Sequence, residues 1–323
     1  MSNSNQLEMM ERIALDLEGV ERALASSFNT GSEDFNTLIR PLSEAGGKRL
    51  RAQLCLLIAN AGTSVEAERI KIAEAVEMLH LATLIHDDVL DQAEIRRGEE
   101  TIHKHKGNKV AILSGDYLFA KAFRIVSEMP HMEYLKIFSH IITCLVEGEF
   151  MQMEDVYRID QGIDRYMTKT QKKTADFMEG CMELGGLLGG WSSDEIMYLK
   201  RYGHALGMAF QITDDIMDYR ETSDTTGKPV GNDLREGLLT YPLLSIVNES
   251  NQNQLLQDIK NLNHGGNEQE IIDYVIAQGG IDNTLRVAQQ YCDDALSELQ
   301  SIRDFDGKEF LVLAVQNLAD RKV

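Results

Sequence analysis

Residues 64–92 read SVEAERIKIAEAVEMLHLATLIHDDVLDQ, a proline-free stretch in which apolar residues recur at helical spacing. Such spacing gathers the apolar side chains on one helix face; they are Ile70, Ala73, Val76, Leu79, Leu84 and Ile85. Ser64 is the expected N-cap, because its hydroxyl can accept a hydrogen bond from the first helix amides. The stretch predicts one long helix that ends in a cluster of aspartates.

The rest of the chain has the same character, and the expected fold class is all-α. Its 323 residues include only four prolines, at positions 41, 130, 229 and 242, and proline is the residue that breaks helix interiors. No alternation of apolar and polar residues predicts strands. Turn residues predict breaks at 30–33, 60–64, 97–109, 127–132, 189–194, 222–233 and 263–268. None of them resembles a long linker, so we expect a single domain over residues 1–323.

Composition narrows the class of protein. The cysteines (Cys55, Cys144, Cys181 and Cys292) lie far apart, which is typical of reduced thiols in a cytoplasmic protein. The first residues have neither the basic start nor the apolar run of a secretory signal, and no apolar stretch approaches the ~20 residues that span a bilayer. The chain has 52 acidic and 32 basic residues, a net charge of −20, which argues against nucleic-acid binding. An anionic ligand would therefore need a local basic cluster or bound cations.

Two aspartate clusters stand out, and each lies in a helical pattern. The first is within LIHDDVLDQAEIRRG (84–98) and the second within GMAFQITDDIMDYRE (207–221). Because residues four apart share a helix face, the first and last aspartates of each cluster should lie on one side. The candidate metal ligands are Asp87, Asp88 and Asp91 in the first cluster, and Asp214, Asp215 and Asp218 in the second.

Electrostatics favours a bound cation at these clusters. Two like charges ~4 Å apart repel by ~4 kcal/mol at an effective dielectric constant of ~20, so two clusters facing one cavity need cations. Oxygen ligands without Cys or His favour a hard ion such as Mg²⁺, which also binds phosphates. The alternative is a solvated acidic surface. That interpretation fits the pair Asp293 and Asp294, which has Ser297 where a third aspartate would be needed.

Basic residues suited to a diphosphate lie elsewhere in the chain. Arginine offers a planar fork to phosphate oxygens and lysine a mobile charge. Each residue alone is also compatible with an ordinary surface charge, but together they fit an anionic substrate held beside metal ions. The candidates are Lys48 and Arg51, which share a helix face, Arg96 and Arg97 after the first cluster, and Lys173 and Lys228.

Six segments together resemble the trans-isoprenyl diphosphate synthases, the polyprenyl synthetase family. In chain order they are GGKRLR (46–51), LIHDDVLDQAEIRRG (84–98), LSGDYLFAKAF (113–123), the triplet Lys173-Thr174-Ala175, FQITDDIMDY (210–219) and GKPVGNDL (227–234). The resemblance runs from about residue 38 to 245. The segment CLVEGEFMQMEDVYRIDQ (144–161) is most similar to the catalytic large subunit, component II, of heptaprenyl diphosphate synthase.

The resemblance implies a helical bundle of the isoprenoid synthase type with a central active-site cavity. It implies an enzyme that joins an allylic diphosphate, expected to be farnesyl diphosphate, to isopentenyl diphosphate. Three Mg²⁺ ions per site would be bound chiefly by Asp87, Asp91 and Asp214, with Asp88, Asp215 and Asp218 in support. The resemblance places Arg96, Lys173, Gln211 and Lys228 at the allylic diphosphate, and Lys48, Arg51, His80 and Arg97 at isopentenyl diphosphate. Thr174 is a further candidate substrate-binding residue. Lys173 and Lys228 would also take part in catalysis.

Three positions depart from the family's pattern. Ala52 and Glu100 stand where prolines are usual, which should change loop rigidity more than chemistry. Leu238 stands where many relatives carry a lysine after glycine, which removes one phosphate contact.

His80 lies on one helix stripe with Asp87 and Asp91, although a histidine in such a place is otherwise most simply a core residue.

Product length is expected to depend on the residues before the first cluster. In the family, bulky side chains there stop elongation, whereas Ala82 and Thr83 are small; Leu79 and Val76 lie deeper. One helical turn rises about 5.4 Å, comparable with one isoprene unit. With no bulky side chain at Ala82 or Thr83, the resemblance to the family implies a product of about C30–C40, suited to a quinone side chain.

Several alternatives stay open. A class I terpene cyclase shares the helical fold, but its second metal motif usually differs from the complete aspartate motif found here. A non-catalytic regulatory subunit typically lacks one or both motifs. A short-chain (farnesyl or geranylgeranyl) diphosphate synthase is a further alternative. The active form could be a homodimer or a heterodimer with a small regulatory subunit.

Overall fold

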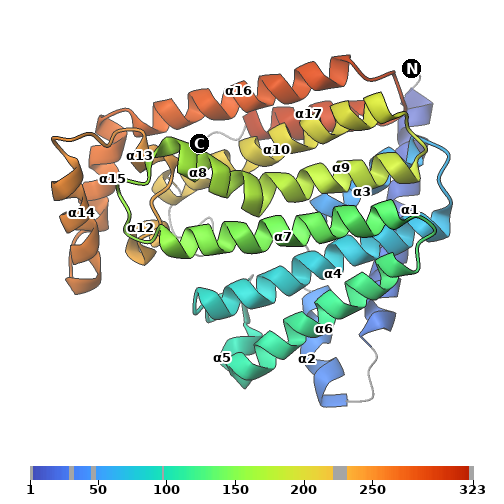
Figure 1. The fold of residues 1–323 in the computed structure, drawn as a ribbon, viewed down its shortest axis with the longest axis horizontal. Coiled ribbons are helices and arrows are strands. Elements are labelled where there is room, and N and C mark those ends of the chain that lie inside the picture. Colours follow the sequence, from blue (N-terminus) through green and yellow to red (C-terminus); the bar gives the residue numbers. More distant parts are fainter. Residues whose placement is uncertain (1–2, 29–32, 45–48, 97, 221–230, 320–323) are drawn as a thin grey trace. The chain divides into compact units, whose positions relative to one another are not determined.

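The structure is a computed structural model that describes residues 3–28, 33–44, 49–96, 98–220 and 231–319. Apart from one short hairpin, the regular structure in these ranges is helical, which confirms the predicted all-α class (Figure 1). The first elements are α1 (Asn3–Ser27), α2 (Glu33–Glu44), α3 (Leu50–Asn60), α4 (Glu66–Leu90), β1 (Ile95–Arg96), β2 (Glu99–Glu100), α5 (Ile102–Lys106), α6 (Asn108–Ser127) and α7 (Met132–Glu154). The remainder are α8 (Gly162–Thr170), the π-helical turn η1 (Gln171–Ala175), α9 (Asp176–Leu188), α10 (Ser193–Arg220), α12 (Asn232–Glu236), α13 (Tyr241–Leu244), α14 (Gln252–Asn261), the 3₁₀ turn η2 (Leu262–His264), α15 (Glu268–Ala277), α16 (Gly280–Gln300) and α17 (Lys308–Ala319).

The start of α4 differs from the sequence prediction. The helix begins at Glu66 with Val65 in the N-cap position, and no side chain caps it. The prediction for Ser64 is therefore wrong: its hydroxyl donates to the carbonyl of Ala59, with an Oγ–O distance of 2.6 Å. Ser64 completes the turn that leaves α3, and this use of the hydroxyl competes with capping the next helix.

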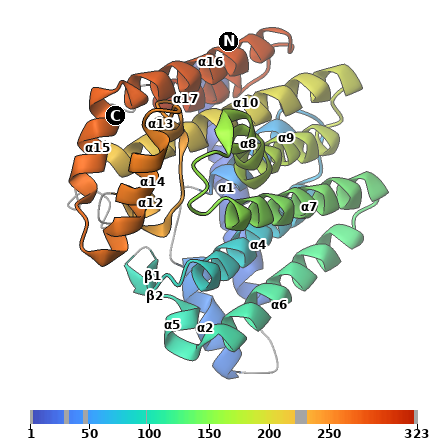
Figure 2. The same cartoon turned by 60° about the vertical axis from the view of Figure 1, so that its left-hand side comes forward.

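A second difference is the hairpin β1–β2, where the sequence predicted no strand. Ile95 pairs with Glu100 and Arg96 with Glu99. The turn includes Gly98 at φ 85°, a backbone conformation that glycine adopts at no steric cost. The hairpin follows directly after the first aspartate cluster and brings the chain back toward the end of α4 (Figure 2).

One compact unit comprises Met1–His140, Gly180–Met197 and Asp304–Lys308, and α4 is its central helix. It packs against α1, α3 and α6, and α4 and α6 lie side by side in Figures 1 and 2. The carboxylate of Asp16 on α1 is buried and accepts hydrogen bonds from Arg69 of α4 at 2.9 Å and Asn60 of α3 at 2.7 Å. Burying such a charge requires partners of this kind, so this contact fixes how the three helices meet.

The other compact unit comprises Ile141–Glu179, Tyr198–Arg303 and Glu309–Val323. Its apolar core includes Ile212 and Ile216 of α10 together with Leu243 and Ile272. Helix α16 packs against α13 and α15, and α14 lies beside α15 (Figure 2). The second aspartate cluster therefore belongs to a helix whose apolar face is packed into this core.

Among the helices of the described ranges, none has the length and apolar composition that crossing a membrane would require.

Candidate functional site

The first aspartate cluster lies at the C-terminal end of α4. Asp91 is the first residue beyond the helix, and its N–H still donates to the carbonyl of Asp87 at 2.8 Å, so the helical turn between them is kept. Asp87 is half-buried and Asp91 is exposed. Asp88 is buried and accepts a hydrogen bond from Arg96, with an Nε–Oδ1 distance of 2.6 Å. The hairpin thus supplies the counter-charge for the middle aspartate and leaves the outer pair on the accessible side.

Arg51 and His80 lie together in the same unit. The Arg51 Nη1 atom is 3.5 Å from His80 Nε2. Burial lowers the pKa of Arg51, an effect that the nearby Cys181 and Glu77 oppose. Nearby, the buried Glu77 accepts hydrogen bonds from Arg49 at 3.1 Å and from the backbone N–H of Ala52 at 3.3 Å. Proline has no N–H, so alanine at position 52 makes a contact that the proline expected there from the resemblance could not make.

The second cluster, in the other unit, is built around the buried Asp215. Its carboxylate accepts hydrogen bonds from the Tyr166 hydroxyl at 2.5 Å and from the Gln211 amide at 3.0 Å. Gln211 in turn accepts a hydrogen bond from Thr174 at 2.9 Å. Burial raises the pKa of Asp215 to about 7, while the hydrogen bonds from Tyr166 and Gln211 act in the opposite direction. Asp214, next to it, is exposed. The second cluster therefore repeats the arrangement of the first, with a bonded middle aspartate and an accessible outer one.

The last aspartate of the second cluster contacts backbone. Asp218 Oδ1 accepts from the N–H of Asn232 at 3.0 Å, and its Oδ2 accepts from the N–H of Asp233 at 3.2 Å. The N–H of Gly231 donates to the carbonyl of Asp218, also at 3.0 Å. Asp218 thus holds the start of α12, and with it the end of the GKPVGNDL segment, against α10.

Lys173 and Thr174 lie on η1, a π-helical turn between α8 and α9. Such turns are rare in proteins, and those that occur are often found at functional sites. Lys173 forms an ion pair with Glu149 of α7 at 2.5 Å. Gly148 makes this approach possible, because a Cβ atom there would lie 2.7 Å from Lys173 Cγ.

Some predicted residues are not placed by the structure. Lys48, Arg97 and Lys228 lie outside the described residues. Asp87 and Asp214 belong to different compact units, so the convergence of the two clusters stays a prediction.

The predicted chain-length residues on α4 differ in accessibility. Val76, Leu79 and Ala82 are fully buried. Thr83 is partly exposed, and its hydroxyl donates to the carbonyl of His80 at 2.8 Å. Only Thr83 of these four is therefore in a position to meet a ligand without rearrangement of the core.

The sequence patterns did not indicate the polar groups that support the second cluster. Besides Tyr166, these are the buried Asp155 and its partners. Asp155 accepts from Arg165 at 2.5 Å, and Lys169 Nζ lies 3.5 Å from it. Burial lowers the pKa of Lys169, and the charges of Asp155 and Asp215 oppose this effect. The four-residue spacing of Arg165 and Lys169 was the available signal, because residues so spaced share a helix face; nothing local indicated Tyr166.

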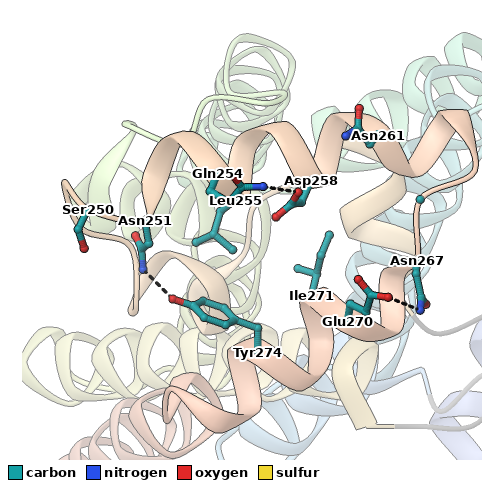
Figure 3. Close-up of a pocket in the computed structure, with 11 residues that line it drawn as sticks. Ser250, Asn251, Gln254, Leu255, Asp258, Asn261, Asn267, Glu270, Ile271 and Tyr274 are labelled. Atoms are coloured by element: carbon teal, nitrogen blue, oxygen red, sulfur yellow. Dashed lines mark hydrogen bonds between the residues drawn. The ribbon is translucent and has the colours of Figure 1, made fainter.

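A pocket of about 660 Å³ lies in the second unit between α14 and α15, and none of its lining residues is a predicted site residue (Figure 3). Its polar side chains bond one another: Gln254 donates to Asp258 at 2.8 Å and Asn267 to Glu270 at 3.1 Å. No charged group there points to a diphosphate. The pocket is lined by Ser250, Asn251, Gln254, Leu255, Asp258, Asn261, Gly266, Asn267, Glu270, Ile271 and Tyr274.

Comparisons with known proteins agree on one family. The sequence profile of the family "Polyprenyl synthetase" matches residues 32–278. The chain is 32% identical over 312 residues to octaprenyl diphosphate synthase of Escherichia coli, covering 95% of this chain and 96% of that protein. It is 32% identical over 288 residues to component 2 of heptaprenyl diphosphate synthase of Geobacillus stearothermophilus, covering 89% and 90%. The structure superposes with a TM-score of 0.88, at 30% identity, on a polyprenyl synthase of Caulobacter crescentus crystallised with calcium and isoprenyl diphosphate, covering 100% of this chain and 98% of that one.

Proposed function

Because the chain belongs to the polyprenyl synthetase family, we propose that it joins farnesyl diphosphate to successive molecules of isopentenyl diphosphate, with Mg²⁺ as cofactor. The relatives named above are octaprenyl and heptaprenyl diphosphate synthases, which supports a medium- or long-chain prenyltransferase. The product would be a polyprenyl diphosphate suited to a quinone side chain.

One observation carries the assignment of the metal site. In each cluster the middle aspartate is buried and bonded by the protein, Asp88 by Arg96 and Asp215 by Tyr166, while outer carboxylates remain accessible. Asp87, Asp91 and Asp214 therefore fit the role of direct ligands for hard cations, which take carboxylate oxygens together with substrate phosphates. Asp88, Asp215 and Asp218 fit supporting roles, because Asp88 and Asp215 are buried and Asp218 holds backbone N–H groups at the start of α12.

Each cycle breaks the C–O bond of the allylic diphosphate, and the diphosphate leaves with the electron pair. The alkene electrons of isopentenyl diphosphate form the new C–C bond to the allylic carbon, and a proton is then lost to the released diphosphate. Mg²⁺ held by Asp87, Asp91 and Asp214 would supply Lewis-acid stabilisation of the departing diphosphate. Lys173, Thr174 and Gln211 would orient the allylic diphosphate, and Arg51 with His80 would bind isopentenyl diphosphate. Lys48, Arg96, Arg97 and Lys228 complete the proposed basic set.

Substitution of the accessible aspartates tests the proposal. The purified chain is assayed with farnesyl diphosphate, isopentenyl diphosphate and Mg²⁺, and products are separated by chromatography. Asp87→Asn and Asp214→Asn should each lower turnover by at least about a hundredfold, since each removes charge that the metal needs. Asp294→Asn, on an exposed pair in the same acidic chain, is the matched control. Full turnover of the two cluster variants, or turnover of the wild type in excess chelator, would refute the metal assignment.

Thr83 offers the best test of product length. Thr83→Phe should shorten the product. Of the four chain-length residues, Thr83 alone is partly exposed, so a bulky side chain there should block the growing chain. The same change at Ala82 would overpack a fully buried site, at a cost of ~1–3 kcal/mol. Chromatography of the products compares Thr83→Phe with a small control, Thr83→Ser. An unchanged product from Thr83→Phe would mean that another element sets the product length. A farnesyl or geranylgeranyl product from the wild type would favour a short-chain synthase.

The partner and the compartment are further parts of the proposal. Helix α7 carries exposed apolar side chains at Val146, Phe150 and Met153, a helical stripe that fits a subunit contact with a second copy or with a small regulatory chain. A cytoplasmic location is supported by Cys55, Cys144, Cys181 and Cys292, which are all buried free thiols.

A further inference from the structure

The start of α9 and the middle of α10 bring together three side chains that the proposed reaction does not use. Asp176 and Glu179 lie one turn apart on α9, and His204 lies on α10. One oxygen of each carboxylate and one imidazole nitrogen all lie within 4.8 Å of one another. Asp176 is only 8% exposed, whereas Glu179 and His204 are half-buried. The group is therefore fixed on its inner side and accessible on its outer side.

The distances within the group suit a small ion. His204 Nδ1 lies 3.6 Å from Glu179 Oε2, and two ligands bound at about 2.1 Å to a tetrahedral ion stand roughly 3.4 Å apart. Lys200 contacts the other oxygen of Glu179, with an Nζ–Oε1 distance of 3.5 Å. The oxygen nearest the imidazole can therefore bind an ion while Lys200 stays in place.

Neighbouring groups also hold the third ligand. Gln171 Nε2 donates to Asp176 Oδ1 at 3.2 Å, and the Cys144 thiol donates to the same carboxylate. Outer contacts of this kind orient ligands at metal sites and raise their affinity. The buried carboxylate is thus oriented before any ion arrives.

We propose that Asp176, Glu179 and His204 bind a divalent transition-metal ion of the Zn²⁺ class, at a site that uses none of the residues of the two aspartate clusters. An imidazole with two carboxylates suits Zn²⁺ and its neighbours in the first row, whereas Mg²⁺ prefers oxygen ligands alone. The ion joins α9 to α10 two residues after Thr174 and two helical turns before Gln211. It braces the two segments whose Thr174–Gln211 hydrogen bond supports the second aspartate cluster.

Cobalt titration in the presence of Mg²⁺ tests the site. The full-length, untagged chain is first saturated with millimolar Mg²⁺, so that hard-cation sites are filled, and Co²⁺ binding is followed by visible absorption and calorimetry. The wild type should bind one Co²⁺ per chain, and Zn²⁺ should displace it. His204→Gln should weaken binding at least about tenfold, whereas His264→Gln, an exposed histidine on η2, should bind as the wild type does.

Two further variants separate a metal site from a simple ion-pair network. Glu179→Gln should also weaken Co²⁺ binding, so the test does not depend on the histidine variant alone. Melting curves recorded without metal show whether each variant is folded. Lys200→Met should tighten binding severalfold, because it removes a positive charge beside the ion. Absence of Co²⁺ binding by the wild type, or equal binding by His204→Gln, would overturn the proposal.

Discussion

At the scale of single residues, an aspartate motif contains carboxylates with different tasks. Asp88 and Asp215 are buried and bonded by Arg96 and Tyr166, while Asp214 is exposed. Removing a buried partner costs more than removing an exposed charge, because the remaining group keeps its desolvation penalty. Substitution of a buried middle aspartate should therefore mainly reduce stability, whereas substitution of an exposed aspartate should mainly weaken metal binding.

Asp218 is expected to contribute to stability through its backbone contacts. Asp218→Ala removes the acceptors for the N–H groups of Asn232 and Asp233, and should lower the free energy of unfolding by about 1 kcal/mol. Asp218→Asn keeps one carbonyl acceptor and should lose less. Denaturant unfolding of the metal-free protein measures both, with the exposed Asp214→Ala as control. Equal stability of Asp218→Ala and the wild type would show that the backbone contact is not formed in solution.

Glu74 is expected to make stability depend on pH. Burial raises the pKa of Glu74, against the opposing hydrogen bond from Ser27. The folded state then binds the proton more tightly than the unfolded state. This contribution is fully present below the ordinary carboxyl pKa and is lost as pH rises through the raised value.

Glu74→Gln cannot ionise and keeps an acceptor for Ser27, so the variant should gain stability relative to the wild type as pH rises. The free energy of unfolding at about pH 5 and about pH 8 gives the comparison. A variant that is relatively less stable at the higher pH would mean that the carboxylate, with Lys71 and Lys121 nearby, is favourably paired.

At the scale of elements, the contact between α10 and η1 supports the second cluster. Gly207 of α10 packs directly on the backbone of η1, where a Cβ atom would lie 2.6 Å from Ala175 Cα. This close approach brings Gln211, one turn later, within hydrogen-bond distance of Thr174. The glycine is therefore part of the geometry that positions the polar network.

Gly207→Ala should separate α10 from η1. The clash is with backbone, so we expect a loss of ~1–3 kcal/mol in stability, partly offset by the higher helix propensity of alanine. The KM for the allylic diphosphate should rise more than the KM for isopentenyl diphosphate. Gly280→Ala is the matched control. A Cβ atom at Gly280 would lie 2.4 Å from the Pro242 carbonyl oxygen, and this contact is not part of the network. Equal kinetic effects of the two substitutions would contradict a specific role for Gly207.

At the scale of the whole molecule, local patterns predicted the helices and both aspartate clusters, because periodicity and spacing are properties of short segments. The partners of those aspartates were not predictable in the same way. Tyr166 and Asp215 lie 49 residues apart in the chain, and their contact depends on how helices pack. Ser64 shows the same limit, since its hydroxyl serves the preceding helix instead of capping the next one.

The assembly that performs the reaction is also a property of the whole molecule. We expect the purified chain, with both clusters complete, to make long products without another protein. The exposed α7 stripe should then be covered by a second copy, and Phe150→Glu should convert a dimer to a monomer in sedimentation. Met10→Glu, at an exposed apolar residue on α1, is the control. Activity that requires an added small subunit would favour the heterodimer.

The π-helical turn has a consequence for how this chain tolerates length changes. A π-turn holds one residue more than an α-helix needs, and each residue corresponds to about 100° of rotation. Deleting Gln171 or Lys172 would let α8 and α9 fuse into one regular helix, which is locally favourable. The fused helix would nevertheless swing Tyr166 away from Asp215 and draw Lys169 out of reach of Asp155. The extra residue therefore acts as a spacer whose removal would straighten the helix and dismantle the support of the second cluster.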